Sequence, residues 1–332
     1  MFVNQPPLRQ NRFGLVAEQL QEGNAIKMNE KVSRIEAIVG RRVKRDITRM
    51  TQLMKGNLQK AAESILSTPD AHVGIVTGFF IQHATPPSPE TDGLIGMGHL
   101  AAGLASAGVP VTVITDAPCA KAVWAVVDAV PEQIDLEVVA TNERSVYRLR
   151  KSLESADRPI THLIAIERVS PAADGKPHRE HGWDMSGETA PLHLLFDDPT
   201  WQRRWTTIGI GDGGNEIGMG SLPADVVETE IPNGRVIAAT TPADYLIVAG
   251  VSNWGGYGLL AAMACLQPEK ASALLRHFNR DMDHRLLSAA VEIGQAVDDS
   301  RVDSPGRPQM SVDRIPWEQH AILLEEIAAA VA

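Results

Sequence analysis

Between residues 72 and 266 the sequence alternates short apolar runs with small-residue or amphipathic segments, and this alternation limits the fold more than any other feature. Strands are expected near 72–80, 109–115, 134–140, 159–167, 205–211 and 245–251, and helices near 92–107, 117–129, 142–155 and 254–266. The apolar runs are almost continuous, as is typical of parallel strands buried on both faces. The sequence therefore predicts a doubly wound, mostly parallel α/β sheet with helices on both faces.

Helical extensions are expected at both ends of this region. From 35 to 65 apolar residues recur every three or four positions, which predicts a helical face broken near Gly40 and Gly56. After 267 helices dominate, with a linker at 300–308 and a last helix at 317–331. We expect an irregular N-terminal arm (1–30) and a single α/β catalytic domain over 31–332, made of a helical segment (31–68), a sheet core (72–266) and a helical C-terminal part (267–332).

Charge and cysteine content disfavour several kinds of partner. The chain has 31 Lys and Arg against 41 Asp and Glu, a formal charge of −10, which disfavours nucleic acid. The most basic run, at 41–45, is expected to be the solvated end of a helix. Cys119 and Cys265 lack metal-ligand spacing, and no apolar run approaches the roughly 18 residues that cross a bilayer. We expect a cytoplasmic protein that binds a small molecule, with no membrane partner and with a homo-oligomer allowed.

The densest polar cluster is the loop GDGGNE at 211–216, directly after a predicted strand. Asp212 and Glu216 are four residues apart and would share one face of a helical turn. Such a pair could bind a divalent cation through oxygen ligands, or one acid could accept a proton. The backbone amides of this glycine-rich loop could instead hold an anion. Its structural interpretation is a tight strand-to-helix turn.

Two further clusters open predicted helices after strands, ETDG at 90–93 and SNWG at 252–255. Thr91, Asp92 and Ser252 are good N-cap residues, which is their structural interpretation. The functional interpretation places substrate against the N-terminal amides of these helices. Because parallel strands end at one edge of a sheet, we expect these clusters and the 211–216 loop to converge there.

Glu167 and Arg168 follow another predicted strand. Arg168 could bind a carboxylate through two parallel hydrogen bonds, and Glu167 could be its ion-pair partner, a general base or a metal ligand. The segment 178–187 interrupts the strand–helix rhythm and contains His178 and His181, but it meets no zinc-protease spacing, so we expect a mobile lid.

The sequence lacks the GxGxxG, Walker and GxSxG signatures in their expected contexts. No recognised motif therefore requires a cofactor. A divalent cation, Mg²⁺ or Mn²⁺, stays open, and Asp212 and Glu216 would be its ligands.

In chain order, five segments resemble the D-glutamate cyclase family: GIVTGF at 74–79, ETDG at 90–93, IER at 166–168, GIGDGGNEIGMG at 209–220 and SNWG at 252–255. The glycine-rich segment at 209–220 is the most specific of the five, and the resemblance spans about 35–266. The chain departs from the family pattern at 183–187 and has Leu94 and Ile95 where the family has Pro-Gly. The resemblance implies a lyase that closes D-glutamate to 5-oxo-D-proline with release of water.

That reaction needs an amine that loses a proton and a side-chain carboxyl made electrophilic, both held in near-attack geometry. Asp212 or Glu216 is expected to accept the proton, and Glu167 is a third catalytic candidate. Arg168 is expected to bind a substrate carboxylate, and the amides of Gly213 and Gly214 to stabilise the oxyanion. The remaining residues expected to contact substrate are Thr91, Asp92, Gly93, Asn215, Ser252 and Asn253.

Two other functions stay open on the sequence. One is a metal-assisted hydrolase or lactamase that acts on a small cyclic amide. The other is a non-catalytic protein that binds an amino acid in the same crevice, which predicts ligand-dependent stabilisation without turnover.

Overall fold

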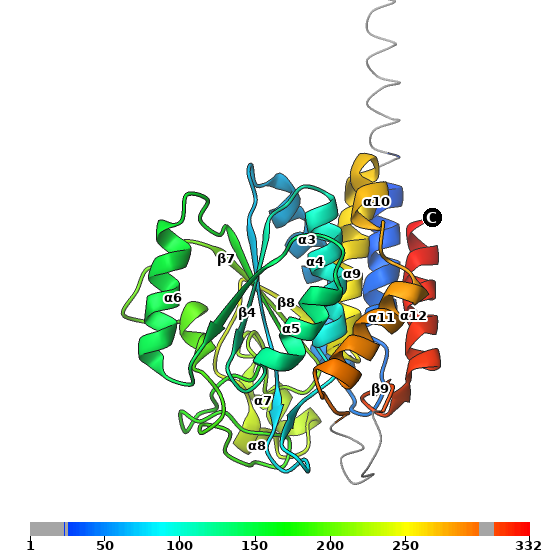
Figure 1. The fold of residues 1–332 in the computed structure, drawn as a ribbon. Coiled ribbons are helices and arrows are strands. Elements are labelled where there is room, and N and C mark those ends of the chain that lie inside the picture. The colour runs from blue at the N-terminus through cyan, green and yellow to red at the C-terminus, as the bar shows by residue number, and fades with distance from the viewer. Residues whose placement is uncertain (1–22, 24–25, 299–308) are drawn as a thin grey trace, which may run out of the picture.

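The computed structural model describes residue 23, residues 26–298 and residues 309–332 (Figure 1). Most of the expected N-terminal arm and the expected linker at 300–308 lie outside the described residues. Residues 26–39 form a helix, so 26–30 differ from the irregular arm that the sequence predicted.

Six parallel strands form one sheet in the order β5-β4-β1-β6-β7-β8. They are β1 (Val73–Thr77), β4 (Val111–Asp116), β5 (Asp135–Val139), β6 (His162–Ile166), β7 (Thr206–Gly211) and β8 (Tyr245–Val248). The predicted doubly wound α/β fold is confirmed. The strand order reverses between β1 and β6, and in such sheets a crevice forms there, outside the carboxyl ends of the strands.

Helices cover both faces of the sheet (Figure 1). The larger core joins one face to α3 (Asn57–Ser67), α4 (Leu94–Ser106), α5 (Ala120–Ala129) and α9 (Ser252–Leu266). The opposite face packs on α6 (Glu143–Ser155) and the 3-10 turn η1 (Leu192–Leu195), and near β8 on α2 (Thr48–Leu53), α7 (Ala224–Glu230) and α8 (Gly234–Ile237). Cys119 and Cys265 are buried.

The small residues of α4 and α9 let these two helices approach closely beside the switch point. A Cβ atom on Gly96 would lie 2.8 Å from the Cα atom of Asn253, so no larger residue fits there. Both helices begin at the carboxyl edge of the sheet, and their close packing fixes the positions of the two N-termini relative to each other.

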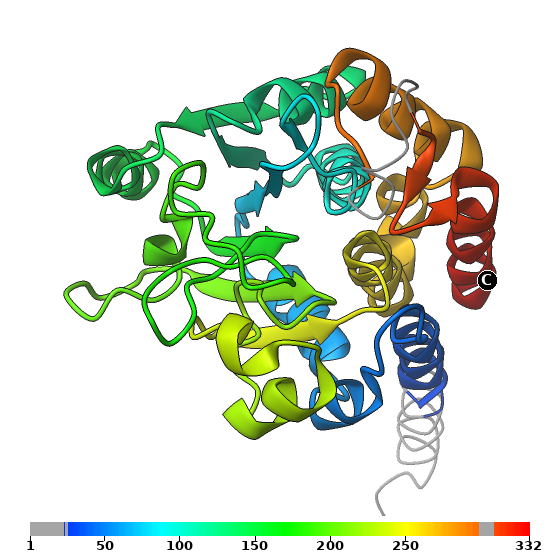
Figure 2. The same cartoon turned by 90° about the horizontal axis from the view of Figure 1, so that it is seen from below.

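The helical extensions are also confirmed. The C-terminal part contains α10 (Pro268–Leu274), α11 (Arg280–Ser288), the π-helical turn η2 (Ala289–Ile293) and α12 (Trp317–Val331), as the sequence predicted for the last helix. Helix 26–39, α9 and α12 lie side by side (Figures 1 and 2), and Lys31 donates to the carbonyl of Val331 at 2.7 Å. None of the helices in the described part of the chain is long and apolar enough to span a bilayer.

Two short hairpins, unpredicted by the sequence, flank the carboxyl edge of the sheet. One is β2 (Phe80–Ile81) with β3 (Ser88–Pro89), and the other is β9 (Ser311–Val312) with β10 (Ile315–Pro316). Asp313 and Arg314 form the turn between β9 and β10 with positive φ angles of 54° and 67°. The turn carries Asp313 to the edge of the sheet where the polar clusters end.

Candidate active site

Six buried acidic side chains converge at the carboxyl edge of the sheet, onto which Figure 2 looks. They come from the segment before α4, the end of β6, the loop after β7 and the β9–β10 turn: Glu90, Asp92, Glu167, Asp212, Glu216 and Asp313. Parallel pairing brings these distant segments together, as expected from the positions of the clusters after strands. Of these six residues, only Asp313 belongs to a segment that no sequence pattern placed at this edge.

Five of these carboxyls form two groups that share Asp212. The inner group is Glu167, Asp212 and Glu216, and the outer group is Asp92, Asp212 and Asp313. In each group one oxygen per residue lies within 4.8 Å of the others. Like charges this close cannot all be ionised in a buried place without a nearby positive charge. Either group could hold a metal ion.

The glycine-rich loop wraps around the carboxylate of Glu216. Its Oε1 accepts from the backbone amides of Asp212 at 3.1 Å and Gly213 at 2.6 Å, while its Oε2 is buried and accepts no hydrogen bond from a described residue. A Cβ atom on Gly211 would lie 2.9 Å from Cδ of Glu216. The amide of Gly213, expected to stabilise an oxyanion, therefore already binds a carboxylate of the protein.

The next two residues of this loop, Gly214 and Asn215, do not bind Glu216 through their backbone amides. Gly214 has a φ of 87°, in the left-handed region that favours glycine, and nothing places its amide in the cavity. Asn215 lines the cavity, and its side-chain amide donates to the carbonyl of His178 at 2.9 Å. This hydrogen bond holds Asn215 in place at the cavity wall.

Glu167 has a left-handed backbone with a φ of 46°, which is rare for residues other than glycine and frequent at functional sites. Its Oε2 accepts from the hydroxyl of Ser252 at 2.5 Å. Burial raises the pKa of Glu167 well above its usual value, and the neighbouring charges of Glu216 and Asp212 add to this effect. A Cβ atom on Gly93 would lie 2.5 Å from Cβ of Glu167, so Gly93 makes the room that this conformation needs.

Asp92 caps a helix other than the one that follows it. Its carboxylate accepts from the amides of Ser252 at 3.0 Å and Asn253 at 2.9 Å, at the start of α9. Burial and the charge of Asp313 raise the pKa of Asp92 to about 7. Asn253 in turn accepts from the amide of Gly96 in α4 at 2.7 Å. Of the expected N-cap residues, Asp92 caps α9 rather than the helix that follows it, whereas the side chain of Ser252 caps no helix and donates to Glu167 instead.

Thr91 also has a structural contact. Its hydroxyl donates to the carbonyl of Ser311 at 3.0 Å, which ties the segment before α4 to the β9–β10 hairpin. Thr91, Asp92, Gly93, Ser252 and Asn253 are not among the residues that line the cavity. They support the acidic residues that do.

Arg168 points away from the acidic groups. Its guanidinium donates to Asp116 at 2.5 Å and to the carbonyls of Gly78 and Ala190, both at 2.8 Å, and the side chain is buried. Successive residues at a strand end project to opposite sides, so Glu167 and Arg168 are directed apart. The expectation that Arg168 binds a substrate carboxylate is revised, because both terminal nitrogens of its guanidinium donate to groups inside the protein.

Two basic residues reach the site instead, and both belong to the run that we expected to be solvated. Arg45 donates to Asp212 at 3.1 Å and to Glu180 at 2.8 Å. Lys44 donates to Asp313 at 2.6 Å. Burial acts to lower the pKa of Arg45, but Asp212 and Asp313 outweigh it and the pKa is raised. The solvated-end prediction is wrong for Arg45, since the chain leaves helix 26–39 at Gly40 and turns over the acidic groups, whereas Lys44 pairs with Asp313 and stays partly exposed.

The sequence offered little that could have placed these residues. A pair of basic residues after a helix break is common at a surface, and Asp313 lies in a hairpin too short to show a periodic pattern. Arg179, which is also buried and lines the cavity, lies in the interrupting segment. No local pattern in the sequence therefore distinguishes these residues from ordinary surface residues.

The buried acidic residues other than Asp92 line a cavity of about 30 Å³, and Lys44, Arg45 and Arg179 line it as well. That volume has room for one or two particles of the size of water. An amino acid is larger, so entry of a substrate requires side chains at the rim to move. Glu180 is partly exposed there and is the nearest such side chain on the 178–187 segment.

The two histidines of that segment do not belong to either carboxylate group. His178 contacts Asp174 at 2.9 Å and the carbonyl of Gly182 at 3.1 Å, within the segment itself. The lid that we expected here stays a prediction. The contacts of Glu180 with Arg45 and of the His178 carbonyl with Asn215 connect this segment to the acidic site.

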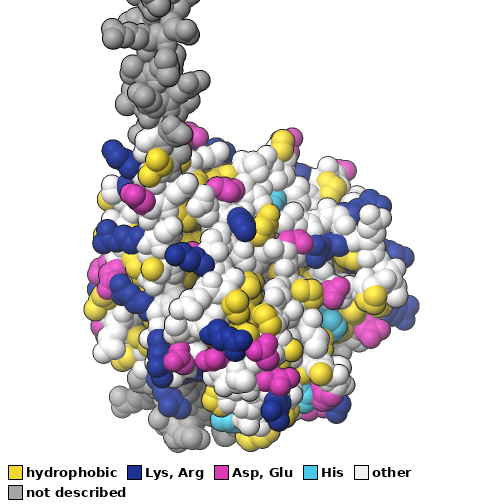
Figure 3. Space-filling model, turned by 180° about the vertical axis from the view of Figure 1, so that it is seen from behind, with side chains coloured by type: hydrophobic (Ala, Val, Ile, Leu, Met, Phe, Trp, Pro, Cys, Tyr) yellow, Lys and Arg dark blue, Asp and Glu magenta, His cyan; other side chains and the backbone are white. Residues whose placement is uncertain are grey.

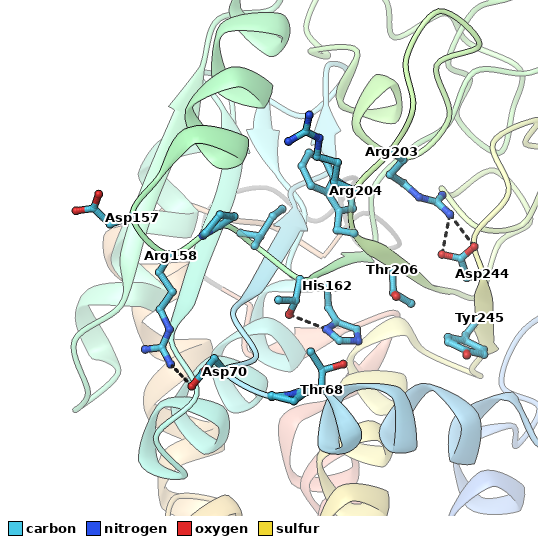
Figure 4. Close-up of a pocket in the computed structure, with 15 residues that line it drawn as sticks. Thr68, Asp70, Asp157, Arg158, His162, Arg203, Arg204, Thr206, Asp244 and Tyr245 are labelled. Atoms are coloured by element: carbon cyan, nitrogen blue, oxygen red, sulfur yellow. Dashed lines mark hydrogen bonds and ion pairs between the residues drawn. The ribbon is translucent and has the colours of Figure 1, made fainter.

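A larger depression, of about 1310 Å³, lies at the opposite edge of the sheet, at the amino ends of β1, β6, β7 and β8 (Figure 4). Two ion pairs lie along it: Arg203 contacts both oxygens of Asp244 at 2.7 and 2.8 Å, and Arg158 lies 3.9 Å from Asp70. Surface pairs of this kind are common and carry little energy. The buried acidic cavity is therefore our candidate site.

On the face of the molecule in Figure 3, basic and acidic side chains are interspersed.

The fold and the site define a doubly wound α/β protein with a buried acidic centre at the switch point of its sheet. Residues 35–328 match the family described as D-glutamate cyclase-like, C-terminal, and the chain belongs to this family. It is 33% identical over 222 residues to the human protein named D-glutamate cyclase, mitochondrial. The aligned region covers 64% of this chain and 36% of the human protein, so the chain spans little more than a third of that relative. The resemblance seen in the sequence is confirmed, whereas a cytoplasmic location stays a prediction.

Proposed function

We propose that this chain is a lyase of the D-glutamate cyclase type, which converts D-glutamate to 5-oxo-D-proline and water. The observation that carries the proposal is the pair of carboxylate groups that share Asp212. A cyclase must hold an ammonium group beside a carboxyl group, and two adjoining subsites suit such a substrate. Membership in the family and the similarity to the human protein support the assignment.

We assign the outer group to the substrate ammonium. The ammonium group of Lys44 already lies there, 2.6 Å from Asp313, so the subsite accommodates this charge. Lys44 is partly exposed and can withdraw toward solvent when a substrate enters. The substrate amine would then lie beside Asp212.

We assign the proton transfer to Asp212, the carboxylate that belongs to both groups. The amine nitrogen bonds to the side-chain carboxyl carbon, one carbon–oxygen bond breaks, and two of the three ammonium protons leave with that oxygen as water. One carboxylate that takes protons from the amine and returns them to the leaving oxygen therefore suffices. Burial and the charge of Asp313 raise the pKa of Asp212 well above its usual value, while Arg45 opposes the rise. A raised pKa makes it a stronger proton acceptor.

We assign to Arg45 the carboxylate-binding role that we had expected of Arg168. Its guanidinium lies at the cavity between Asp212 and Glu180 and can bind a substrate carboxylate through two hydrogen bonds once Glu180 moves. Holding the amine and the carboxyl carbon in contact in a water-poor cavity can itself lower the barrier by several kcal/mol. Glu216 and Glu167 remain the further catalytic candidates.

The test is to incubate the protein with D- and L-glutamate, with and without EDTA, and to follow 5-oxoproline by chiral chromatography. We expect 5-oxo-D-proline from D-glutamate. Asp157→Asn, a change at an exposed residue remote from the cavity, should leave the rate unchanged. Absence of product from both enantiomers contradicts the proposal.

A second candidate is a metal-assisted hydrolase of a small cyclic amide, which the inner carboxylate group favours because it can hold a cation that activates water. Ring opening is the reverse of the cyclisation, so the same site serves either direction. Faster hydrolysis of a five- or six-membered lactam than cyclisation of glutamate would favour this candidate. Ligand-dependent thermal stabilisation without any turnover would instead favour an amino-acid-binding protein.

A further inference from the structure

The two carboxylate groups differ in how their charge is compensated. In the outer group Lys44 pairs with Asp313, and Arg45 pairs with Asp212. Glu167 and Glu216 of the inner group form no ion pair with any Lys or Arg among the described residues. The outer group thus has two cationic side chains for its three carboxyls, whereas the inner group has only Arg45, which it shares through Asp212. The inner group is therefore the one that lacks compensating charge within the described residues.

The hydrogen bonds of the inner group suit ionised acids. The hydroxyl of Ser252 donates to Glu167, and the amides of Asp212 and Gly213 donate to Glu216. In each of these hydrogen bonds the carboxyl group is the acceptor, as an ionised carboxylate must be. Oε2 of Glu216 is buried and has no hydrogen-bond donor among the described residues, and a buried oxygen of this kind is costly unless another ligand satisfies it.

The ligand atoms also indicate the kind of cation. Three carboxylates lie within reach of one ion, and Asn215 stands at the wall of the same cavity. An all-oxygen set of this kind suits a hard divalent cation such as Mg²⁺ or Mn²⁺ rather than zinc. The cavity of about 30 Å³ has room for such an ion together with a water molecule.

We infer that the inner group, Glu167, Asp212 and Glu216, is a binding site for one divalent cation of the Mg²⁺ or Mn²⁺ type. Only its catalytic role rests on the proposed function. A cation there would neutralise the side-chain carboxylate of the substrate next to the amine held by the outer group. Because Asp212 belongs to both groups, it fixes the distance between the two subsites.

The experiment titrates the EDTA-treated full chain with Mn²⁺, follows free Mn²⁺ by electron paramagnetic resonance, and records thermal unfolding in parallel. We expect one saturable equivalent and a rise in the unfolding temperature. Glu216→Gln and Glu167→Gln should each weaken binding by about tenfold or more. Asp313→Asn, which alters the outer group alone, should keep most of the affinity, and Asp157→Asn should keep all of it.

Two glutamine variants are used in case one of them does not fold. Thermal unfolding in EDTA shows whether each variant is folded. The inference is overturned if the wild-type chain shows no saturable Mn²⁺ binding, or if Asp313→Asn removes binding that the two glutamine variants retain. Mn²⁺ binding without glutamate turnover supports the site and contradicts the cyclase proposal. Turnover that persists in EDTA, in a chain that binds no Mn²⁺, overturns the site and leaves the cyclase proposal standing.

Discussion

Asp92 and Asn253 join the starts of two helices across the switch point of the sheet. Asp92 precedes α4 and accepts from the amide of Asn253 in α9, while the side chain of Asn253 accepts from an amide of α4. Each helix thus receives its cap from the neighbour. This reciprocal capping holds the two N-termini in place behind Glu167 and the inner group.

Asn253→Ala should cost about 1–3 kcal/mol in the free energy of unfolding, because the buried amide of Gly96 loses its acceptor. Urea denaturation measures the change. Asn142→Ala is the matched control: Asn142 caps α6 at the surface, at 3.0 Å from the amide of Ser145. Its loss should cost about 0.5–1 kcal/mol. Equal costs for the two variants would show that the capping across helices adds nothing.

Arg168→Met should destabilise the fold by about 3–5 kcal/mol, because Asp116 is left as a buried charge without its partner. Asp116→Asn in the same chain should recover a large part of this loss, and denaturation of the four members of the cycle gives the coupling energy. If the single variant kept its stability and only KM for glutamate rose, Arg168 would bind the substrate after all.

Asp212→Asn should lower turnover by about a hundredfold or more, because an amide cannot accept the ammonium proton. Arg45 can still donate to the remaining oxygen, so the fold should be kept, and circular dichroism checks it. Asp174→Asn, a change at an exposed residue that does not line the cavity, is the control. Near-normal rates in Asp212→Asn would transfer the proton step to Glu216.

Lys44→Gln should lower KM for glutamate by about two- to tenfold with kcat almost unchanged, because the substrate ammonium no longer competes with Lys44 for the outer group. Arg42→Gln is the control, since Arg42 is exposed and pairs with Asp46 outside the cavity. A rise in KM would mean that Lys44 itself binds a carboxylate of the substrate. Steady-state kinetics at fixed ionic strength separates these results.

His162 should make the protein less stable in mild acid. Burial lowers the pKa of His162 to about 4, whereas the unfolded chain has an ordinary pKa of about 6.5. Between these values the unfolded chain binds more protons, so stability falls as the pH drops from 6.5 to 4, by up to about 3 kcal/mol. His162→Gln should flatten the stability curve in this window relative to the wild-type chain. An unchanged slope, or the same flattening in exposed His284→Gln, would contradict this.

The sequence predicted the six strands because continuous apolar runs and small-residue helices are local properties of the chain. β7 and α12 lie within about a residue of their expected bounds for this reason. The parallel arrangement then followed from the strand–helix alternation, and with it the convergence of Asp92, Glu167, Asp212 and Glu216 at one edge. The order of strands and helices along the chain was therefore enough to predict that these four residues meet.

The tertiary structure decided how the charges are used. Arg45 and Asp212 are 167 residues apart and Lys44 and Asp313 are 269 apart, and no periodic pattern connects such positions. Arg168 was assigned to substrate because its chemistry suits a carboxylate, but the carboxylate that it meets is Asp116. Residue type tells which charges can pair, whereas only packing determines which of them are buried together, and burial sets which pairs form.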